Sequence, residues 1–130
     1  MERAGNERTG NALINLPVKA GAALTECTMA AINADGYAET ATATAGLKVA
    51  GCVQRFCDNA GGAAGDVLVE VKRGTFVWNN DGTIEATDIL KKCYVKDDTT
   101  VTITADGSSV AGIILAVEPD GVTVDMTQNA

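Results

Sequence analysis

Short runs of alternating apolar and polar residues follow one another along most of this chain. In the clearest run, residues 67–71, Val67, Val69 and Val71 share one face of the predicted strand, and residues 122–126 alternate in the same way. Turn signals rich in Gly, Asp and Asn separate the runs about every 8–12 residues, a spacing typical of all-β sandwiches and barrels. The pattern therefore predicts an all-β fold of antiparallel strands, arranged as a small barrel or sandwich.

One sequence pattern occurs twice, in residues 37–71 and again in residues 94–126. Each copy runs from a Tyr through a Thr-rich stretch into an apolar strand, then through a turn into an alternating strand. A β unit of this kind exposes one face of its sheet unless a second layer covers it. The repeat therefore suggests an internal duplication that closes into a barrel or sandwich. Gly51 and Gly112 lie inside the apolar strands, where glycine predicts a bulge or a close backbone crossing.

The first 15 residues differ from the rest of the chain. Residues 1–15 are rich in Gly, Asn, Glu and Arg and show neither the period of a strand nor that of a helix. They are predicted to form an extended N-terminal arm, either a disordered tail or an arm that orders on a neighbouring molecule. The short apolar run of residues 13–18 is compatible with an edge strand, where Pro17 is tolerated.

The remaining residues, 16–130, are predicted to form a single β domain. Its one plausible helical turn lies within residues 84–93, where Thr87 or Asp88 can cap the turn. In this turn Ile89 and Leu90 are expected to face inward. The segment is too short to form an independent helix.

Size and charge narrow the classes of function. At 130 residues and 13.3 kDa the chain fits one domain. Its net charge of −7 and its scattered basic residues argue against direct binding of nucleic acid, which needs clustered Lys and Arg. An acidic surface suits a positively charged patch on a protein partner instead.

The N-terminal sequence shows no apolar region typical of a secretory signal, and no apolar run approaches the roughly 20 residues that span a bilayer. We therefore expect the protein to be made in the cytoplasm and to have no membrane partner. In that reducing compartment Cys27, Cys52, Cys57 and Cys93 are expected to be free core thiols. A disulfide and a four-thiolate metal site remain as less favoured alternatives.

No reactive constellation emerges from the sequence. The chain contains no His, which removes the usual Ser-His-Asp and Cys-His pairs. The glycine-rich residues 61–66 lack the Lys-Ser/Thr of a phosphate loop. Asp97, Asp98, Asp106 and Asp120 are interpreted as solvated turn residues rather than as calcium ligands. The sequence therefore predicts no catalytic residue, no cofactor, no metal and no enzymatic activity.

The aromatic residues concentrate at one place in the chain. Phe76 and Trp78 alternate along a predicted strand and should share one face, with Lys72 and Arg73 just before them. Core packing is one interpretation of this pair. The other is an oligomer or partner interface in which the Trp forms the centre and the basic residues form the rim.

The residues named so far carry a resemblance to the head decoration, or cement, proteins of tailed bacteriophages. The resemblance covers residues 16–127 and rests on these segments: Ala50-Gly51-Cys52-Val53, Gly65 to Val71, Arg73-Gly74-Thr75-Phe76-Val77-Trp78, Val110-Ala111-Gly112-Ile113-Ile114 and Asp120 to Val124. It implies a non-enzymatic virion protein on the outer surface of the capsid. Such a protein bridges neighbouring major capsid subunits as a homo-oligomer, with a trimer favoured.

Within that resemblance, the polar arm would contact the capsid. The arm residues assigned to this contact are Glu2, Arg3, Asn6, Arg8 and Asn11. Two other classes of function stay open. One is a different virion component, from a tail tube, connector or fibre, and the other is a small carbohydrate- or metal-binding β module.

Overall fold

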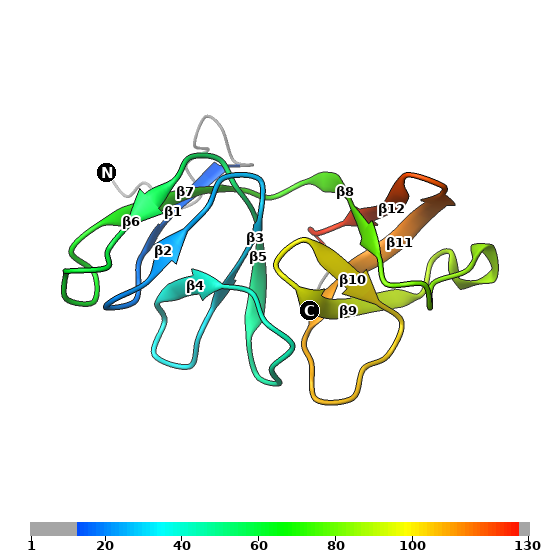
Figure 1. Cartoon of the computed structure of the whole chain (residues 1–130), viewed down its shortest axis with the longest axis horizontal. Helices are drawn as coiled ribbons and strands as arrows, with labels where there is room; N and C mark the ends of the chain where they lie inside the picture. Colours follow the sequence, from blue (N-terminus) through cyan, green and yellow to red (C-terminus); the bar gives the residue numbers. More distant parts are fainter. Residues whose placement is uncertain (1–12, 128–130) are drawn as a thin grey trace, which may run out of the picture.

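The structure is a computed structural model that describes residues 13–127, and within this range the chain is almost entirely β (Figure 1). This confirms the predicted all-β class. The strands are β1 (Leu13–Pro17), β2 (Ala23–Leu24), β3 (Met29–Ile32), β4 (Ala38–Thr40), β5 (Lys48–Val53), β6 (Cys57–Asp58), β7 (Leu68–Lys72), β8 (Thr75–Asn80), β9 (Lys92–Asp97), β10 (Thr100–Thr102), β11 (Val110–Glu118) and β12 (Gly121–Asp125). A single 3₁₀ turn, η1 (Ala86–Asp88), interrupts the strands of the described range.

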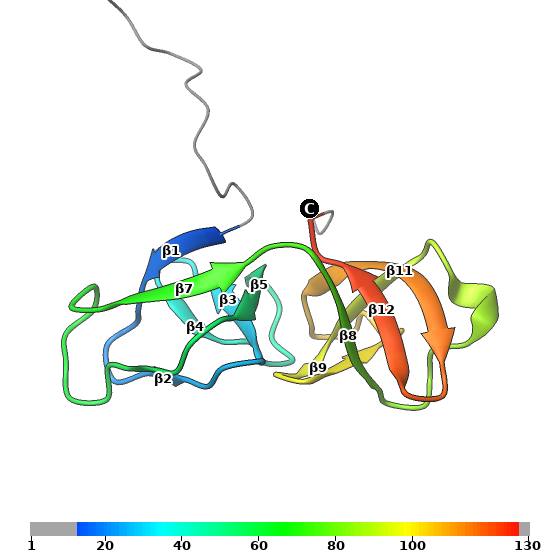
Figure 2. The ribbon, with the colours of Figure 1, turned by 90° about the horizontal axis from the view of Figure 1, so that it is seen from above.

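The strands form two lobes that lie side by side (Figures 1 and 2). In the N-terminal lobe the sheet has the order β1-β7-β5-β3-β4, and the short pair β2-β6 forms a separate two-stranded sheet. The C-terminal lobe is a closed barrel with the order β10-β8-β12-β11-β9. β7 passes directly into β8 and so connects the lobes.

The two lobes share one topology, which confirms the internal duplication predicted from the repeated sequence pattern. The two strand orders coincide when β1, β7, β5, β3 and β4 are matched with β8, β12, β11, β9 and β10. The strand pairing agrees in detail as well. The register of β5 against β3 shifts at Ala50, just before Gly51, and the register of β11 against β9 shifts at Ala111, just before Gly112. Both predicted bulges are therefore present, at equivalent positions.

The closure of each lobe uses parallel pairing, which the sequence did not predict. In the C-terminal barrel β8 and β10 pair in parallel, whereas the expected fold was antiparallel throughout. In the N-terminal lobe the matching strands meet at one isolated parallel bridge, Val18 to Ala38, and the Lys19 N–H donates to the Ala38 carbonyl at 2.9 Å. The N-terminal lobe is thus a less completely closed version of the same barrel.

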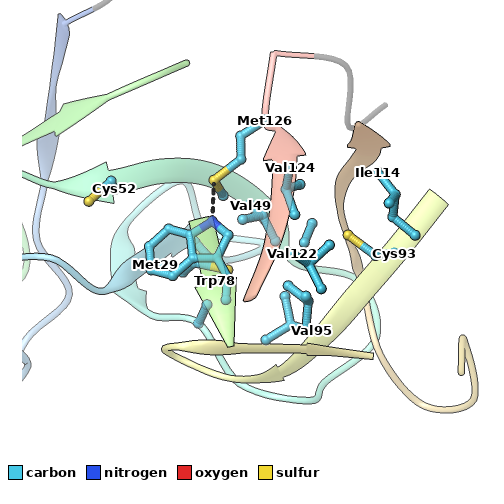
Figure 3. Close-up of a cluster of buried hydrophobic side chains, with 14 of the residues drawn as sticks. Met29, Val49, Cys52, Trp78, Cys93, Val95, Ile114, Val122, Val124 and Met126 are labelled. Carbon is cyan, nitrogen blue, oxygen red and sulfur yellow. Dashed lines mark hydrogen bonds between the residues drawn. The ribbon is translucent and has the colours of Figure 1, made fainter. Parts of the chain in front are cut away.

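Two clusters of buried side chains fill the molecule. The first lies inside the N-terminal lobe and includes Leu24, Val53, Val69 and Val71. The second fills the C-terminal barrel and continues onto the outer face of the N-terminal sheet, where it takes in Met29, Ala31, Val49 and Cys52, several of them shown in Figure 3. The lobes therefore share buried apolar surface.

The predicted boundary between the N-terminal arm and the β domain can be compared with the first strand of the structure. The limit drawn between arm and domain, after residue 15, falls inside β1, which begins at Leu13 and is an edge strand paired with β7. The edge-strand interpretation is confirmed. The arm residues Glu2, Arg3, Asn6, Arg8 and Asn11 lie outside the described residues. That residues 16–130 form a single domain stays a prediction.

The expected helical turn is present, but its apolar residues face the other way. Ile84, Asp88 and Cys93 are buried in this segment, whereas Ile89 and Leu90 are both exposed, so the prediction that these two face inward was wrong. Asp88 closes the turn from within by accepting the Glu85 N–H at 2.9 Å. The Leu90 backbone then takes a left-handed conformation (φ 73°), which is uncommon for a residue other than glycine, and its N–H donates to the Ile114 carbonyl at 2.7 Å.

Candidate functional site

The four residues predicted to form an interface lie where one lobe passes into the other. Lys72 ends β7 and is exposed, and Arg73 occupies the connection. Phe76 is half-buried on β8, and Trp78 is only 5% exposed. These residues therefore lie at the junction between the lobes rather than on a free outer rim.

Trp78 is a core residue, which corrects its assignment to an interface between molecules. Its indole N–H points at the Met126 sulfur, at 3.2 Å, and it lies among the buried side chains of the second cluster (Figure 3). The Phe76 ring lies beside it with a centroid distance of 6.1 Å, so the predicted shared face is confirmed. The core-packing interpretation holds for Trp78 because a docking partner cannot reach a side chain enclosed in this way.

Arg73 ties the two lobes together through its guanidinium group. One terminal nitrogen donates to the Ala50 carbonyl of the N-terminal lobe at 2.9 Å, and the other donates to the Met126 carbonyl of the C-terminal lobe at 3.0 Å. The Met126 N–H donates in turn to the Gly74 carbonyl at 2.9 Å. Charge-assisted bonds to two carbonyls from different lobes fix the angle of the connection.

We expect Arg73→Lys to lower the free energy of unfolding by about 1–2 kcal/mol, because a single ammonium group cannot reproduce the two-pronged contact. Chemical denaturation followed by Trp fluorescence measures this change. Lys72→Arg is the matched control, since the neighbouring side chain is exposed, and it should change stability by less than about 0.5 kcal/mol. Equal losses for the two variants would contradict the role assigned to Arg73.

All four cysteines are free thiols, as expected, but only two of them lie in the core. Cys52 and Cys93 are buried, Cys57 is half-buried and Cys27 is exposed. Burial raises the pKa of the Cys93 thiol to about 12, and burial also raises the pKa of Cys52. Both buried thiols therefore stay protonated near neutral pH and behave as small apolar side chains.

The acidic residues of the turns hold the backbone. Asp97 accepts the Thr99 N–H at 2.9 Å, and this bond lowers the pKa of the Asp97 carboxyl. Asp125 accepts the Thr127 N–H at 3.0 Å in the same manner. Within residues 13–127 no group of three Cys, Asp or Glu side chains gathers in a way that could hold a metal ion.

The structure leaves several large apolar side chains exposed that the sequence interpretation missed. Phe56 and Leu68 line one hollow of the N-terminal lobe, and Ile89, Leu90 and Leu115 are exposed on the C-terminal barrel. The signal for Leu68 was present in the sequence. Because Val67, Val69 and Val71 alternate inward, the leucine between them has to point outward.

Comparison of the chain with models of known protein families, with curated proteins and with solved structures finds no match in any of the three. Within the described range no helix has the length and apolar character needed to cross a membrane.

Proposed function

We propose that this chain is a structural virion protein that attaches to the outer surface of a tailed-phage head and bridges neighbouring major capsid subunits. One structural observation supports the proposal most directly. Two barrels are locked together through a shared core, while large apolar side chains remain on the outside, among them Phe56, Leu68 and Leu90. Phe56 and Leu68 line one hollow together, and apolar side chains gathered on a surface are typical of protein contact sites.

The geometry suits a clamp between two subunits. The Arg73 contacts and the shared core join the two lobes, so a load applied to one lobe would be carried to the other. Many copies of one modest contact then add their strength across a lattice. The net charge of −7 favours a capsid surface that presents basic residues.

A binding assay on purified capsids tests the proposal. The protein should co-sediment with expanded heads and leave unexpanded heads unoccupied, because expansion creates the lattice that a bridging protein recognises. Decorated heads should also withstand higher temperature than bare heads. Binding to neither form of the head, or equal binding to both, would refute the proposed role.

Deletion of residues 1–9 should weaken attachment to expanded heads roughly tenfold, because an arm that orders on the lattice adds contact area to the folded part. The melting temperature should stay within about 1 °C of the full chain, since the described fold begins at Leu13. Co-sedimentation and thermal unfolding measure the two effects. A variant in which the same nine residues are shuffled separates sequence-specific contacts from mere length.

A further inference from the structure

Two of the four cysteines meet at the carbonyl group of Val53. The Val53 oxygen accepts the Cys27 N–H at 2.8 Å and the Cys52 S–H at 3.7 Å. The Cys27 backbone, in the turn before β3, and the Cys52 sulfur, on β5, therefore approach the same atom. Disulfides join cysteines whose Cα atoms lie about 4.4–6.8 Å apart, a separation comparable to that of facing residues on paired strands. The pairing thus places the two thiols at neighbouring positions of the N-terminal lobe.

The backbone of Cys27 is held in a conformation that glycine usually occupies. Its φ of 64° lies in the left-handed region. The Cys27 N–H donates to the Val53 carbonyl while the Val53 N–H donates to the Thr28 carbonyl, also at 2.8 Å. Two residues therefore oppose one, as in a β-bulge whose first residue is commonly a left-handed glycine. Strained residues of this kind cluster at functional sites, and the exposed Cys27 thiol can meet a soluble oxidant that the buried Cys52 cannot.

The surroundings of the other two cysteines differ from those of this pair. The Cys57 S–H donates to the Leu68 carbonyl at 3.5 Å and packs against the cluster inside the N-terminal lobe, whereas Cys52 belongs to the cluster that both lobes share. Cys93 is enclosed in the C-terminal barrel. After the larger effect of burial, the charge of Cys27 also raises the pKa of Cys52, so these two groups lie within electrostatic reach of each other. Proximity therefore favours Cys27 with Cys52 over the other pairings.

We infer that Cys27 and Cys52 form a redox-responsive pair, which hydrogen peroxide converts to a disulfide within one molecule. In the first step the Cys27 thiolate attacks the peroxide, an S–O bond forms, the O–O bond breaks, and the departing hydroxide takes up a proton and leaves as water. The Cys52 sulfur then attacks the Cys27 sulfenic acid. The S–S bond forms, the S–O bond breaks, and the Cys52 proton leaves with the hydroxyl group as a second water. The two thiols lose two electrons, and one peroxide is reduced to two waters.

The disulfide would fasten the turn before β3 to β5 beside the junction of the lobes. Cys52 is paired with Met29, and both belong to the shared cluster, so the bond would hold the face against which the barrel packs. Closing the loop from residue 27 to residue 52 also restricts the unfolded chain. The oxidised protein should therefore melt about 10 °C higher than the reduced protein, and dithiothreitol should reverse the shift. The inference concerns the purified chain and does not depend on the capsid role.

Peptide mapping of the peroxide-treated protein tests the pairing. The reduced full chain is exposed to hydrogen peroxide at low protein concentration, and the remaining thiols are alkylated before digestion with trypsin. Cleavage after Lys19, Lys48, Arg55 and Lys92 leaves each cysteine in a different peptide. Mass spectrometry without reduction should find residues 20–48 joined to residues 49–55, with a mass two hydrogen atoms below the sum of the two peptides.

Single substitutions separate this pair from the other cysteines. Cys27→Ser and Cys52→Ala should each abolish both the joined peptides and the rise in melting temperature, and Cys57→Ser is the matched control that should retain both. Circular dichroism confirms that each variant is folded, and Cys27→Ser, at an exposed position, carries the test if the buried Cys52→Ala does not fold. A different pair of joined peptides, a disulfide between two molecules, or oxidation of Cys27 to sulfinic acid with no cross-link would each overturn the inference.

Discussion

Replacement of Trp78 by alanine should lower the free energy of unfolding by about 3–5 kcal/mol, the range for a large buried aromatic side chain. Trp78 is only 5% exposed and belongs to the cluster that both lobes share. The truncation would leave a cavity in the cluster that holds Trp78 together with Met29 of the N-terminal lobe and Val122 of the barrel (Figure 3). It would also remove the donor to the Met126 sulfur.

The shared cluster gives this prediction a second, more specific signature. Because the lost volume lies between the lobes, the variant should unfold less cooperatively, and the denaturant dependence of the transition should become shallower. Urea unfolding followed by far-ultraviolet circular dichroism measures both quantities. Val77→Ala, on the exposed face of the same strand, should change stability by less than about 0.5 kcal/mol. A loss below about 1 kcal/mol for Trp78→Ala would contradict its place in the core.

The duplicated topology could be predicted from the sequence because its signals are local. The alternation of Val67, Val69 and Val71 fixes the inward face of β7, and the glycines of the two apolar strands mark the bulges. The same signals recur at the matching strands of the second lobe, so the same reasoning predicts the strands of both lobes.

What could not be predicted depends on contacts between distant segments. The spacing of Phe76 and Trp78 placed both on one face, but only the position of the N-terminal lobe shows that this face is enclosed. The parallel pairing of β8 with β10 joins segments about 20 residues apart in the chain, and no periodicity encodes it. Hydrophobicity alone placed Leu90 inward, whereas the turn after η1 directs it to solvent.

Comparison of the two lobes also shows which residues make their matching outer positions differ. In the N-terminal lobe the outer residue paired with Cys52 is Met29, and both are buried against the second lobe. At the matching place in the barrel, Lys92 is paired with Ile113, and Lys92 is exposed. The buried Met29 and the exposed charged Lys92 thus distinguish the covered outer face of one lobe from the uncovered position of the other.

Substitution of the two equivalent glycines, Gly51 and Gly112, is the other change expected to lower stability strongly. A Cβ atom on Gly51 would lie 2.2 Å from the Lys72 carbonyl oxygen, and a Cβ atom on Gly112 would lie 2.4 Å from the Asp125 carbonyl oxygen. In both lobes the neighbouring strand therefore approaches the bulge so closely that only a hydrogen atom fits. The obstructing atoms belong to backbone, which cannot turn aside as a flexible side chain would.

We therefore expect Gly51→Ala and Gly112→Ala each to lower the free energy of unfolding by about 3 kcal/mol, the upper part of the usual range for overpacking. Gly51 should be the more sensitive site, because its φ of 154° adds backbone strain to the clash. Chemical denaturation measures both losses. Gly61→Ala is the control, since a Cβ atom there meets nothing within 4 Å. Because the two lobes repeat one design, a large loss at one glycine and none at the other would contradict the structural equivalence of the bulges.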